Sequence, residues 1–519
     1  MRINRHTAAL ALTAVLVAGG AAYGLHTVSD HRISGASPAD NEVTDTASEF
    51  LSAWQAGDLD KAARLTTDPN QAVTELRAYR DQTGAASLTL APEPATQATV
   101  PFRVAARLNY LGTKATWNYT AKLFVVDDPA AGGPRVSWHS SVIHPSLPDG
   151  GGYTLQAFTQ SGAPITTDRH GTPLTAHTQP GLTQILSQLQ DRYAGQGQQA
   201  LGIRLSAAGD GGGGRVVATL GRGTKAQIRT GLDATTQKAV DTAAARYPGA
   251  SVVVIRPSTG DVLAAHTTGV DFDPTLEGVQ APGQIFELVT AAALLEQGAI
   301  TPSTPVGCPA QASYGGRTFT DPGGFTAQNA LFSEVFAHAC DTGYVRLADE
   351  LTGQDLASEA RDVFGLGRDW HTGITTADGA VPELHGSDLA AAAVGQGEVR
   401  LNTLNLASLT ATIQNGSFKQ PLFTDPDTIG KGIAHAARPL SDHVADELRS
   451  LMRAYGDTAG IGAAAFGGVA DQFTDSDQPI TGWFTAYRGD LAVAVTAPEP
   501  THQPKTAEDV VRAVLGAIG

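Results

Sequence analysis

The hydrophobic pattern near the start of the chain predicts a small domain of helices followed by strands. Apolar residues at helical spacing predict two helices before residue 66. Strict alternation of apolar and polar residues over 102–110, and again over 117–125 after a short turn, predicts an antiparallel hairpin with one buried face. A third strand is predicted over 135–142. These elements together predict an α+β domain at residues 42–147.

The pattern then changes from irregular to strongly periodic. A glycine-rich break at 149–152 precedes a segment, reaching to about residue 226, in which glycines 211–214 predict a hairpin tip or a flexible loop. From residue 228 onward strands and helices are clearly marked. The expected elements are a strand and helix over 228–247, a hairpin of 251–255 and 262–266, helices to about 412, strands near 482–487 and 491–496, and a final amphipathic helix over 506–518. This order indicates a sheet flanked by helices rather than a repeat array.

The first 29 residues have the pattern of an export signal. Basic residues at positions 2 and 5 precede an apolar run over 8–25, and small residues at 19–22 offer a cleavage site. The run is just long enough to span a membrane as a helix. We expect a retained single-span anchor in the plasma membrane, followed by a polar linker at 30–41; the alternative is secretion after signal cleavage. With either, the bulk of the chain works outside the cytoplasm.

Composition narrows the function classes. A chain of 519 residues is too long for one core, and 42 % apolar residues are too many for a disordered protein. A formal net charge of −16 argues against a nucleic-acid partner. The two cysteines, Cys308 and Cys340, are a disulfide candidate in an oxidising compartment, or else two buried free thiols. Neither zinc-ligand spacing nor a nucleotide-binding motif occurs, so no metal and no cofactor is expected.

Five short strings, in order, carry a resemblance to a known family. They are DRHGTPLTA at 168–176, TGLDATTQKAV at 230–240, PSTGDVL at 257–263, VGQGEVRLNTLNLA at 394–407 and ITGWFTAY at 480–487. The fourth departs from the family pattern, with Thr403 and Asn405 where the family has Pro and Gln. In this order the strings resemble the class B penicillin-binding proteins, especially the methicillin-resistance branch and its actinobacterial relatives.

The resemblance implies a multidomain α+β architecture. Residues 42–147 would form a nuclear-transport-factor-like α+β domain, and 148–226 a pedestal or linker segment of the dimerisation type. Residues 227–519 would form a penicillin-binding transpeptidase domain, similar to serine β-lactamases, with a central antiparallel sheet flanked by helices.

The family's chemistry depends on three motifs that this sequence alters. A Ser at a helix start attacks a D-Ala-D-Ala carbonyl or a β-lactam, and a Lys three residues later acts as base; S-x-N supplies a relay and K-T-G a cation for the substrate carboxylate. The positions that match these catalytic residues are Gln284, Glu287, Ala339, Asp341, Phe466 and Gly468. None of the eight lysines has a Ser three residues before it, and Lys-Thr-Gly and Lys-Ser-Gly are absent. We therefore expect that no catalytic residue is retained.

The substitutions also predict a changed charge in the cleft. Glu287 and Asp341 would replace cationic and neutral groups, and the added negative charge would disfavour carboxylate ligands. Alternatively, the two acids share a proton or hold a cation.

The leading functional hypothesis is a membrane-anchored pseudoenzyme, a non-catalytic penicillin-binding-protein homologue that scaffolds or regulates peptidoglycan synthesis. Its expected partners are cell-wall synthases or a membrane glycosyltransferase, with peptidoglycan nearby. Two alternatives remain open. One is a D,D-transpeptidase or hydrolase with altered catalytic residues, in which Glu287 is the base for water. The other is a sensor that binds a wall fragment or an antibiotic without reacting.

Overall fold

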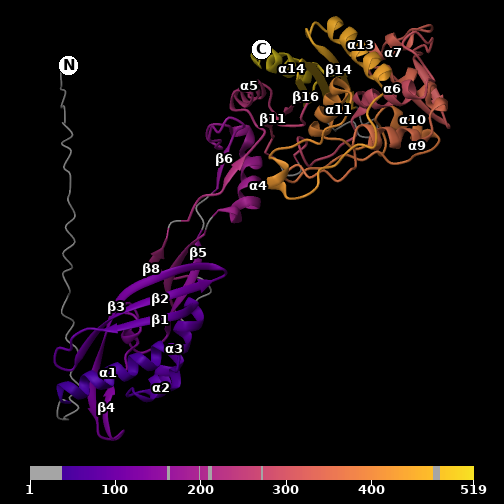
Figure 1. Cartoon of the computed structure of the whole chain (residues 1–519). Coiled ribbons are helices and arrows are strands. Elements are labelled where there is room, and N and C mark those ends of the chain that lie inside the picture. The colour runs from indigo at the N-terminus through magenta and orange to yellow at the C-terminus, as the bar shows by residue number, and fades with distance from the viewer. Residues whose placement is uncertain are drawn as a thin grey trace, which may run out of the picture. The chain divides into compact units, whose positions relative to one another are not determined.

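The computed structural model describes most of the chain (Figure 1). The described residues are 38–160, 164–197, 199–207, 213–221, 223–269, 273–470 and 480–518. Contacts between Cα atoms divide the chain into two compact units: unit 1 runs to Ala157 and includes Ile203–Ala218, and unit 2 comprises Phe158–Gly202 and Thr219–Gly519. The predicted pedestal segment is thus divided between the two units.

The predicted export segment, residues 1–29, lies outside the described residues. Within the ranges that the structure does describe, none of the helices combines the length and the apolar character needed to cross a bilayer.

The first part of unit 1 contains three helices and an antiparallel sheet. The helices are α1 (Asp40–Gln55), α2 (Leu59–Arg64) and α3 (Pro69–Thr83). The sheet has the order β1-β2-β3-β4, with bounds Ala85–Pro92, Thr99–Tyr110, Thr113–Asp128 and Gly133–Val136. Buried and exposed residues alternate along β2, because one face of the sheet packs against the helices. The predicted hairpin is confirmed as β2 and β3.

Three features of unit 1 differ from the prediction, the first being strand β1, which was not predicted. Helix α3 was missed, although Asp68 caps its start, Pro69 occupies its first turn and Gly84 ends it in a left-handed conformation, which are ordinary helix boundary signals. The predicted strand over 135–142 is wrong in extent. Strand β4 ends at Val136, and the segment Ser140–Val142 forms a 3-10 turn, η1, instead.

The region predicted as irregular contains regular structure. Its elements are β5 (Tyr153–Gln160), β6 (Ile165–Thr167), η2 (Pro180–Leu182), α4 (Thr183–Tyr193), η3 (Ala194–Gln196), β7 (Ala200–Ala207) and β8 (Arg215–Leu220). Strands β5, β7 and β8 are neighbours in a three-stranded sheet, and β6 pairs in parallel with β9 (Gln227–Arg229). The partner of β5 is distant in sequence, and β6 and β9 have only three residues each, so local periodicity did not show these pairings. The predicted loop at 211–214 falls largely outside the described residues.

A five-stranded antiparallel sheet forms the centre of unit 2, with the order β11-β10-β16-β15-β14. Its strands are β10 (Ser251–Ile255), β11 (Val262–His266), β14 (Ala464–Ala470), β15 (Ile480–Arg488) and β16 (Leu491–Glu499). Helices α5 (Ala234–Ala244) and α14 (Lys505–Ile518) cover one face, and α11 (Thr403–Asn415) and its neighbours cover the other. Every residue of β10 is buried, which explains its uninterrupted apolar run. The predicted sheet flanked by helices is confirmed.

The remaining elements of unit 2 form a mostly helical region. They are η4 (Gly283–Phe286), α6 (Glu287–Glu296), α7 (Phe332–Ala337), α8 (Asp341–Arg346), η5 (Ala348–Glu350), α9 (Gly353–Ser358), η6 (Glu359–Val363), α10 (Ser387–Ala393), α12 (Pro426–Ile429) and α13 (Asp442–Thr458), with a short hairpin of β12 (Gln311–Tyr314) and β13 (Arg317–Thr320). A disulfide joins Cys308 to Cys340, the residue before α8. The predicted disulfide is therefore present, and the alternative of two buried free thiols is wrong.

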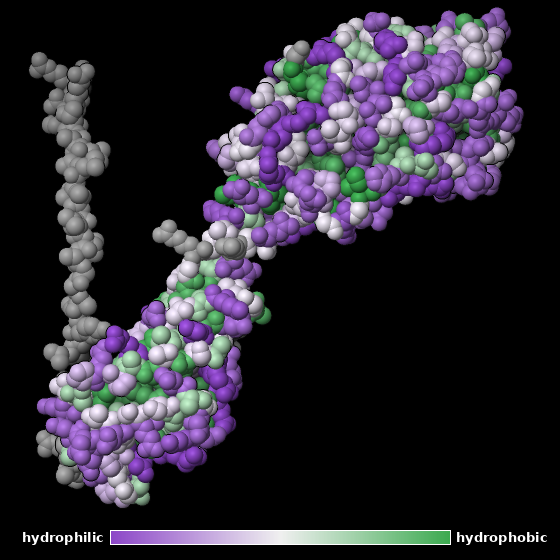
Figure 2. All heavy atoms as spheres, in the orientation of Figure 1, coloured by the Kyte–Doolittle hydropathy of each residue, from purple (hydrophilic) through white to green (hydrophobic). Residues whose placement is uncertain are grey.

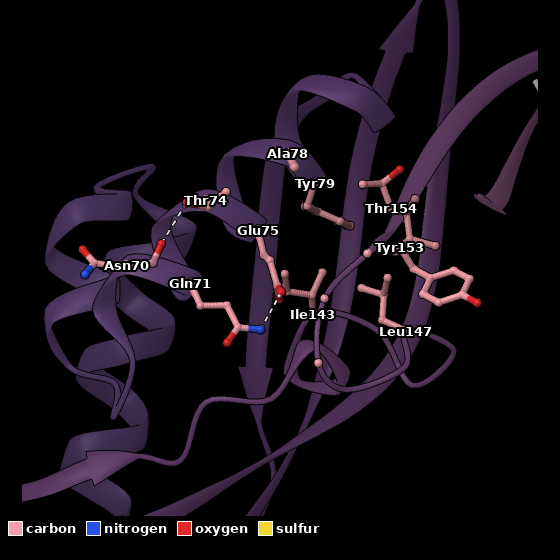
Figure 3. Close-up of a pocket in the computed structure, with 14 residues that line it drawn as sticks. Asn70, Gln71, Thr74, Glu75, Ala78, Tyr79, Ile143, Leu147, Tyr153 and Thr154 are labelled. Carbon is pink, nitrogen blue, oxygen red and sulfur yellow. Dashed lines mark hydrogen bonds between the residues drawn. The ribbon is translucent and has the colours of Figure 1, made fainter. Parts of the chain in front are cut away.

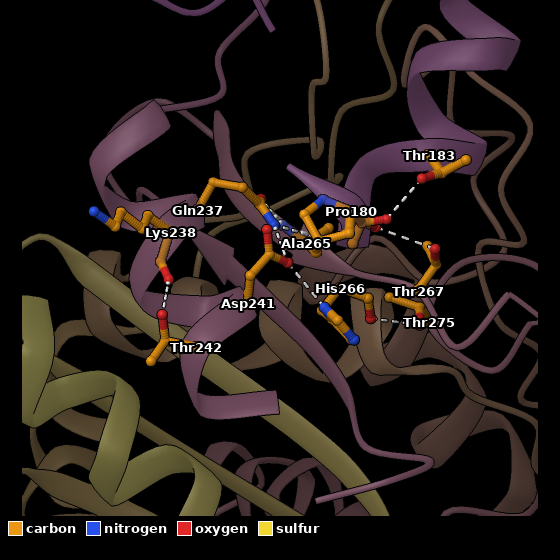
Figure 4. Close-up of polar contacts among 11 residues, drawn as sticks. Pro180, Thr183, Gln237, Lys238, Asp241, Thr242, Ala265, His266, Thr267 and Thr275 are labelled. Atoms are coloured by element: carbon orange, nitrogen blue, oxygen red, sulfur yellow. Dashed lines mark hydrogen bonds and ion pairs between the residues drawn. The ribbon is translucent and has the colours of Figure 1, made fainter. Parts of the chain in front are cut away.

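Edge strand β11 is protected by side chains of α5 (Figure 4). The amide of Gln237 donates to the carbonyl of Ala265 at 2.8 Å and accepts its N–H at 2.9 Å, replacing the strand partner that an edge lacks. One turn further, Asp241 Oδ1 lies 2.9 Å from His266 Nδ1. Gly181 of η2 fits against this pair only because it has no side chain: a Cβ there would lie 2.3 Å from Asp241 Oδ1.

Polar residues cover most of the visible face of both units (Figure 2). Their apolar residues lie instead in buried clusters between sheets and helices. Few large apolar side chains of the described residues are exposed; they are Leu111, Tyr153, Val216, Val279 and Leu331.

Candidate active-site cleft

A 3-10 turn followed by a helix places two of the predicted site residues. Gly283 opens η4 with φ +60°, and a Cβ on it would lie 2.2 Å from the carbonyl oxygen of Val469, so only glycine fits. The turn continues directly into α6. Gln284 and Glu287 are one turn apart and project from the same face. Both are buried, with 5 % and 0 % of their surface exposed.

Gln284 connects strand β14 to the turn between α7 and α8. Its Oε1 accepts a hydrogen bond from the N–H of Val469 at 3.0 Å, and its Nε2 donates to the carbonyl of Ala339 at 2.6 Å. A longer contact of 3.4 Å joins Nε2 to Asp321 Oδ1. Gly468 faces the same side chain, and a Cβ on it would lie 2.5 Å from the Gln284 Cβ. Residues from the three predicted motifs therefore meet at one carboxamide.

Glu287 and Asp341 form a buried pair of acids behind Gln284. Burial raises the pKa of Glu287 well above its usual range, and the charges of Asp341 and Asp321 raise it further. Burial, and then the charge of Asp321, raise the pKa of Asp341 as well. Within the described part of the chain, neither oxygen of Glu287 has another hydrogen-bond partner. Protonation of one carboxyl group removes the repulsion between the two acids.

This pairing corrects the expected charge of the cleft. We predicted that Glu287 and Asp341 add negative charge, but burial raises the pKa of both carboxyl groups, which favours their protonated forms and lowers that charge. Asp341 is further held by Gln396, whose Nε2 donates to its Oδ2 at 3.3 Å. Of the alternatives considered from the sequence, a shared proton fits this geometry.

Three neighbours of the pair were not found from the sequence. Asp321 follows β13; burial raises its pKa to about 6, against the opposing effect of backbone N–H groups such as that of Phe325. The hydroxyl of Tyr344 is buried beside Glu287 and lacks a hydrogen-bond partner among the described residues. Gln396 lies within the family-like string at 394–407, but its contact with Asp341 was not predicted. No motif marks Asp321 or Tyr344, because only the fold brings them to Glu287.

Phe466, which matches the position of the family's substrate-binding Lys, belongs to an aromatic cluster. Its ring centroid lies 4.5 Å from that of Phe336 and 5.2 Å from that of Tyr455. It is fully buried in β14, two residues before Gly468 and hence on the same face of the strand. The cleft thus holds a packed ring at this position rather than a cation.

What remains open is a hollow of about 250 Å³ in front of Gln284. Gln284, Ala339 and Gly468 contribute to its wall, together with His338 and Lys505. The ring of His338 stacks on Phe325 with centroids 3.6 Å apart. The ammonium of Lys505 lies 3.1 Å from Glu508 and 2.9 Å from Asp509, so its charge is already paired.

Sequence comparisons identify both parts of the chain. Residues 250–516, just over half of it, match the penicillin binding protein transpeptidase domain. Residues 42–151 match the NTF2-like N-terminal transpeptidase domain. The chain therefore belongs to the penicillin-binding protein transpeptidase family.

Its relatives include mycobacterial proteins. The chain is 28 % identical over 229 residues to penicillin-binding protein PbpB of Mycolicibacterium smegmatis, covering 39 % of this chain and 35 % of the relative. It is 27 % identical over 293 residues to the peptidoglycan D,D-transpeptidase PbpA of Mycobacterium tuberculosis, covering 46 % and 58 %. The chain thus spans less than two thirds of the length of these relatives.

Solved structures agree with this fold. PBPA from M. tuberculosis superposes with a TM-score of 0.50 at 25 % identity, over 57 % of this chain and 82 % of the other. Pseudomonas aeruginosa PBP2, at 17 % identity, superposes with a TM-score of 0.52 over 70 % and 96 % and supports the fold alone.

Proposed function

We propose that this member of the family does not catalyse transpeptidation and instead works as a scaffold or regulator of peptidoglycan synthesis outside the cytoplasm. The observation that carries the proposal is the carboxamide of Gln284 in the nucleophile's position. Its nitrogen lone pair is delocalised and does not attack acyl groups, and both ends of the group are engaged by Val469 and Ala339.

The same bridge removes the electrostatic part of the reaction. Acyl transfer requires backbone N–H donors aimed at the oxyanion that develops beside the nucleophile. The N–H of Val469 points at residue 284, but the carboxamide oxygen of Gln284 already accepts it. The chain's own side chain therefore takes the position that a substrate carbonyl would need.

No general base replaces the family's lysine. Glu287 is fully buried, and burial and the charge of Asp341 raise its pKa, which favours the protonated form that cannot act as a base. Phe466 offers no charge for a substrate carboxylate. Nucleophile, base, oxyanion donor and carboxylate-binding cation are thus all missing or occupied, whereas the frame of the family is intact. A preserved frame suits a partner of active cell-wall synthases or of a membrane glycosyltransferase.

Fluorescent penicillin tests the proposal on the purified chain. M. tuberculosis PBPA, solved as a penicillin G acyl-enzyme complex, is the positive control. We expect no covalent label on this chain. We also expect none on Gln284→Ser, because Glu287 cannot take the serine proton. Stoichiometric labelling that disappears when one nucleophile is replaced would overturn the proposal.

One observation favours a second function, hydrolysis by an acid pair. Two carboxyl groups that share a proton can act as acid and base for a water molecule. Glu287 and Asp341 form such a pair, although Gln284 covers them. A panel of muropeptides tests this function. If the chain releases product from them and Glu287→Gln abolishes the release, the chain is a hydrolase and not a non-catalytic scaffold. Co-purification from membranes would identify the partner that the proposed scaffold or regulatory function requires.

A further inference from the structure

Unit 1 contains a cavity of about 560 Å³, well separated in sequence from the cleft (Figure 3). One side is formed by α3, from Asn70 to Tyr79. The other is formed by the segment from Ile143 through the glycines 150–152 to Leu155. The volume lies in the range of pockets that hold small organic ligands.

The cavity has an apolar body and one polar end. Its apolar wall consists of Ala78, Tyr79, Ile143, Leu147 and Leu155. The wall is fixed by hydrogen bonds: the hydroxyl of Tyr119 lies 3.1 Å from that of Tyr79 and 2.9 Å from the carbonyl of Ile143. Asn70, Gln71, Thr74 and Glu75 supply the polar groups, all from successive turns of α3, as Figure 3 shows.

Glu75 is the electrostatic centre of this end. Its Oε1 accepts hydrogen bonds from Gln71 Nε2 at 2.9 Å and from Ser140 Oγ at 3.0 Å. Its Oε2 is shielded from solvent and has no hydrogen-bond partner in the described part of the chain. A donor brought by a ligand would satisfy this oxygen after a rotation of the carboxylate.

The lining contains no compensating charge. None of its residues is a Lys, Arg or His, and no ion pair among the described residues includes Glu75. An anionic ligand is disfavoured beside this carboxylate, and an ammonium group is attracted.

The mouth of the cavity is suited to admit a ligand. Glycines 150, 151 and 152 have φ of +94°, +76° and +82°, and a Cβ on any of them would meet nothing within 4 Å. Tyr153 follows them with 46 % of its surface exposed, more than a tyrosine of a closed core. An exposed ring beside an apolar hollow offers a surface on which a ligand packs.

We propose that this cavity is a binding site for a small amphipathic cation, with an apolar body in contact with Tyr79 and Ile143 and an ammonium group directed at Glu75. The site is independent of the cleft, and its occupancy does not require any reaction at Gln284.

Three probes with the same phenyl body test the charge preference on the purified full chain. They are 2-phenylethylammonium, neutral 2-phenylethanol and anionic 3-phenylpropanoate, each titrated by calorimetry and by saturation-transfer NMR. We expect the cation to bind about tenfold more tightly than the alcohol, and the anion to bind least. Equal binding of the three, or binding of none, overturns the proposal.

Two variants and a control locate the site. Glu75→Gln retains the acceptor for Gln71 and should abolish the preference for the cation, whereas Ala78→Trp should fill the hollow and eliminate binding of all three probes. Glu49→Gln changes an exposed carboxylate of α1, ion-paired to Lys61 at 3.1 Å, and should leave binding unchanged. Circular dichroism verifies that each variant is folded. Unchanged cation binding by folded Ala78→Trp would overturn the assignment to this cavity.

Discussion

The two hollows of the molecule differ in how their polar groups are held. In the cleft of unit 2, the carboxamide of Gln284 satisfies a backbone N–H and a backbone carbonyl, and Glu287 and Asp341 neutralise each other. In the cavity of unit 1, Glu75 keeps one carboxylate oxygen without a partner among the described residues. Both hollows contain unpartnered atoms, since the oxygens of Glu287 and the hydroxyl of Tyr344 also lack hydrogen-bond partners among the described residues. The hollow of the cleft, at about 250 Å³, is smaller than the cavity of about 560 Å³, so the cavity has more room for a ligand.

The largest effect is expected where the cleft is most tightly packed. Phe466→Lys, which introduces the residue of the family, should lower the free energy of unfolding of unit 2 by about 4 kcal/mol or more, because an ammonium would replace a buried ring. Urea unfolding, monitored by hydrogen exchange of the amides in β14, β15 and β16, measures this loss of stability. Phe466→Leu is the control, with a loss of about 1–2 kcal/mol. A loss under 1 kcal/mol for the lysine variant would mean that the position is open to solvent.

Reduction of the disulfide should affect one unit only. The Cys308–Cys340 bond spans a sequence separation of 32 and secures the turn whose Ala339 carbonyl accepts from Gln284. Breaking it should destabilise unit 2 by about 3–4 kcal/mol through the larger entropy of the unfolded chain. These are the only cysteines of the sequence, so unit 1 should unfold as before. Calorimetry with and without reductant compares the two transitions, and equal shifts in both would contradict the expectation.

Removing the bridge should loosen the cleft without unfolding it. Gln284→Ala leaves the Val469 N–H and the Ala339 carbonyl without hydrogen-bond partners. The free energy of unfolding of unit 2 should fall by about 1–3 kcal/mol as a result. Amide exchange at Val469 should then be about 10- to 100-fold faster. Gln414→Ala is the matched control, since this exposed glutamine also donates to a backbone carbonyl, that of Gly489 at 2.8 Å. Unchanged exchange at Val469 would show that the bridge does not close the cleft.

The two units should respond to pH in opposite directions. In unit 2 the pKa of Glu287 is raised by burial, so the folded state binds more protons above pH 4.5 and stability falls as pH rises. In unit 1 burial, and then the charge of Arg215, lower the pKa of His144 to about 4, so the unfolded state binds more protons between pH 4 and 6.5 and stability rises with pH. Each proton of difference corresponds to about 1.4 kcal/mol per pH unit.

Urea titrations between pH 4 and 8 measure both slopes. Glu287→Gln should reduce the slope of unit 2 alone, where burial also raises the pKa of Asp321 to about 6 and that of Glu359 to about 7. His144→Asn should reduce the slope of unit 1 alone. Parallel slopes in the two units of the unmodified protein would contradict the raised pKa of Glu287.

The smallest effect is expected from filling the open cavity. Ala78→Leu adds apolar volume next to empty space, so the stability of unit 1 should change by less than about 1 kcal/mol. The same substitution at Ala292, which is fully buried in α6, should cost about 1–3 kcal/mol through overpacking. Thermal unfolding measures the stability of both variants. Equal losses of stability would mean that the space beside Ala78 is already filled.

Local patterns in the sequence were sufficient for much of the fold. Period-two alternation predicted β2 and β3, the apolar run SVVVI predicted β10, and the amphipathic pattern at the end predicted α14. Ordered family strings indicated the matched transpeptidase domain. Gln284 and Glu287 were also accessible, because a spacing of three residues places them on one helical face.

Only the tertiary structure decided the chemistry of the site. Whether Glu287 is charged depends on its burial and on Asp341 and Asp321, which lie more than 30 residues away in sequence. The partners of Gln284 are backbone groups, whose direction no residue type specifies. The cavity at Glu75 likewise depends on a loop brought against a helix some 70 residues earlier. Sequence periodicity determines which face of an element is buried, but protonation and hydrogen bonding depend on what the fold places against that face.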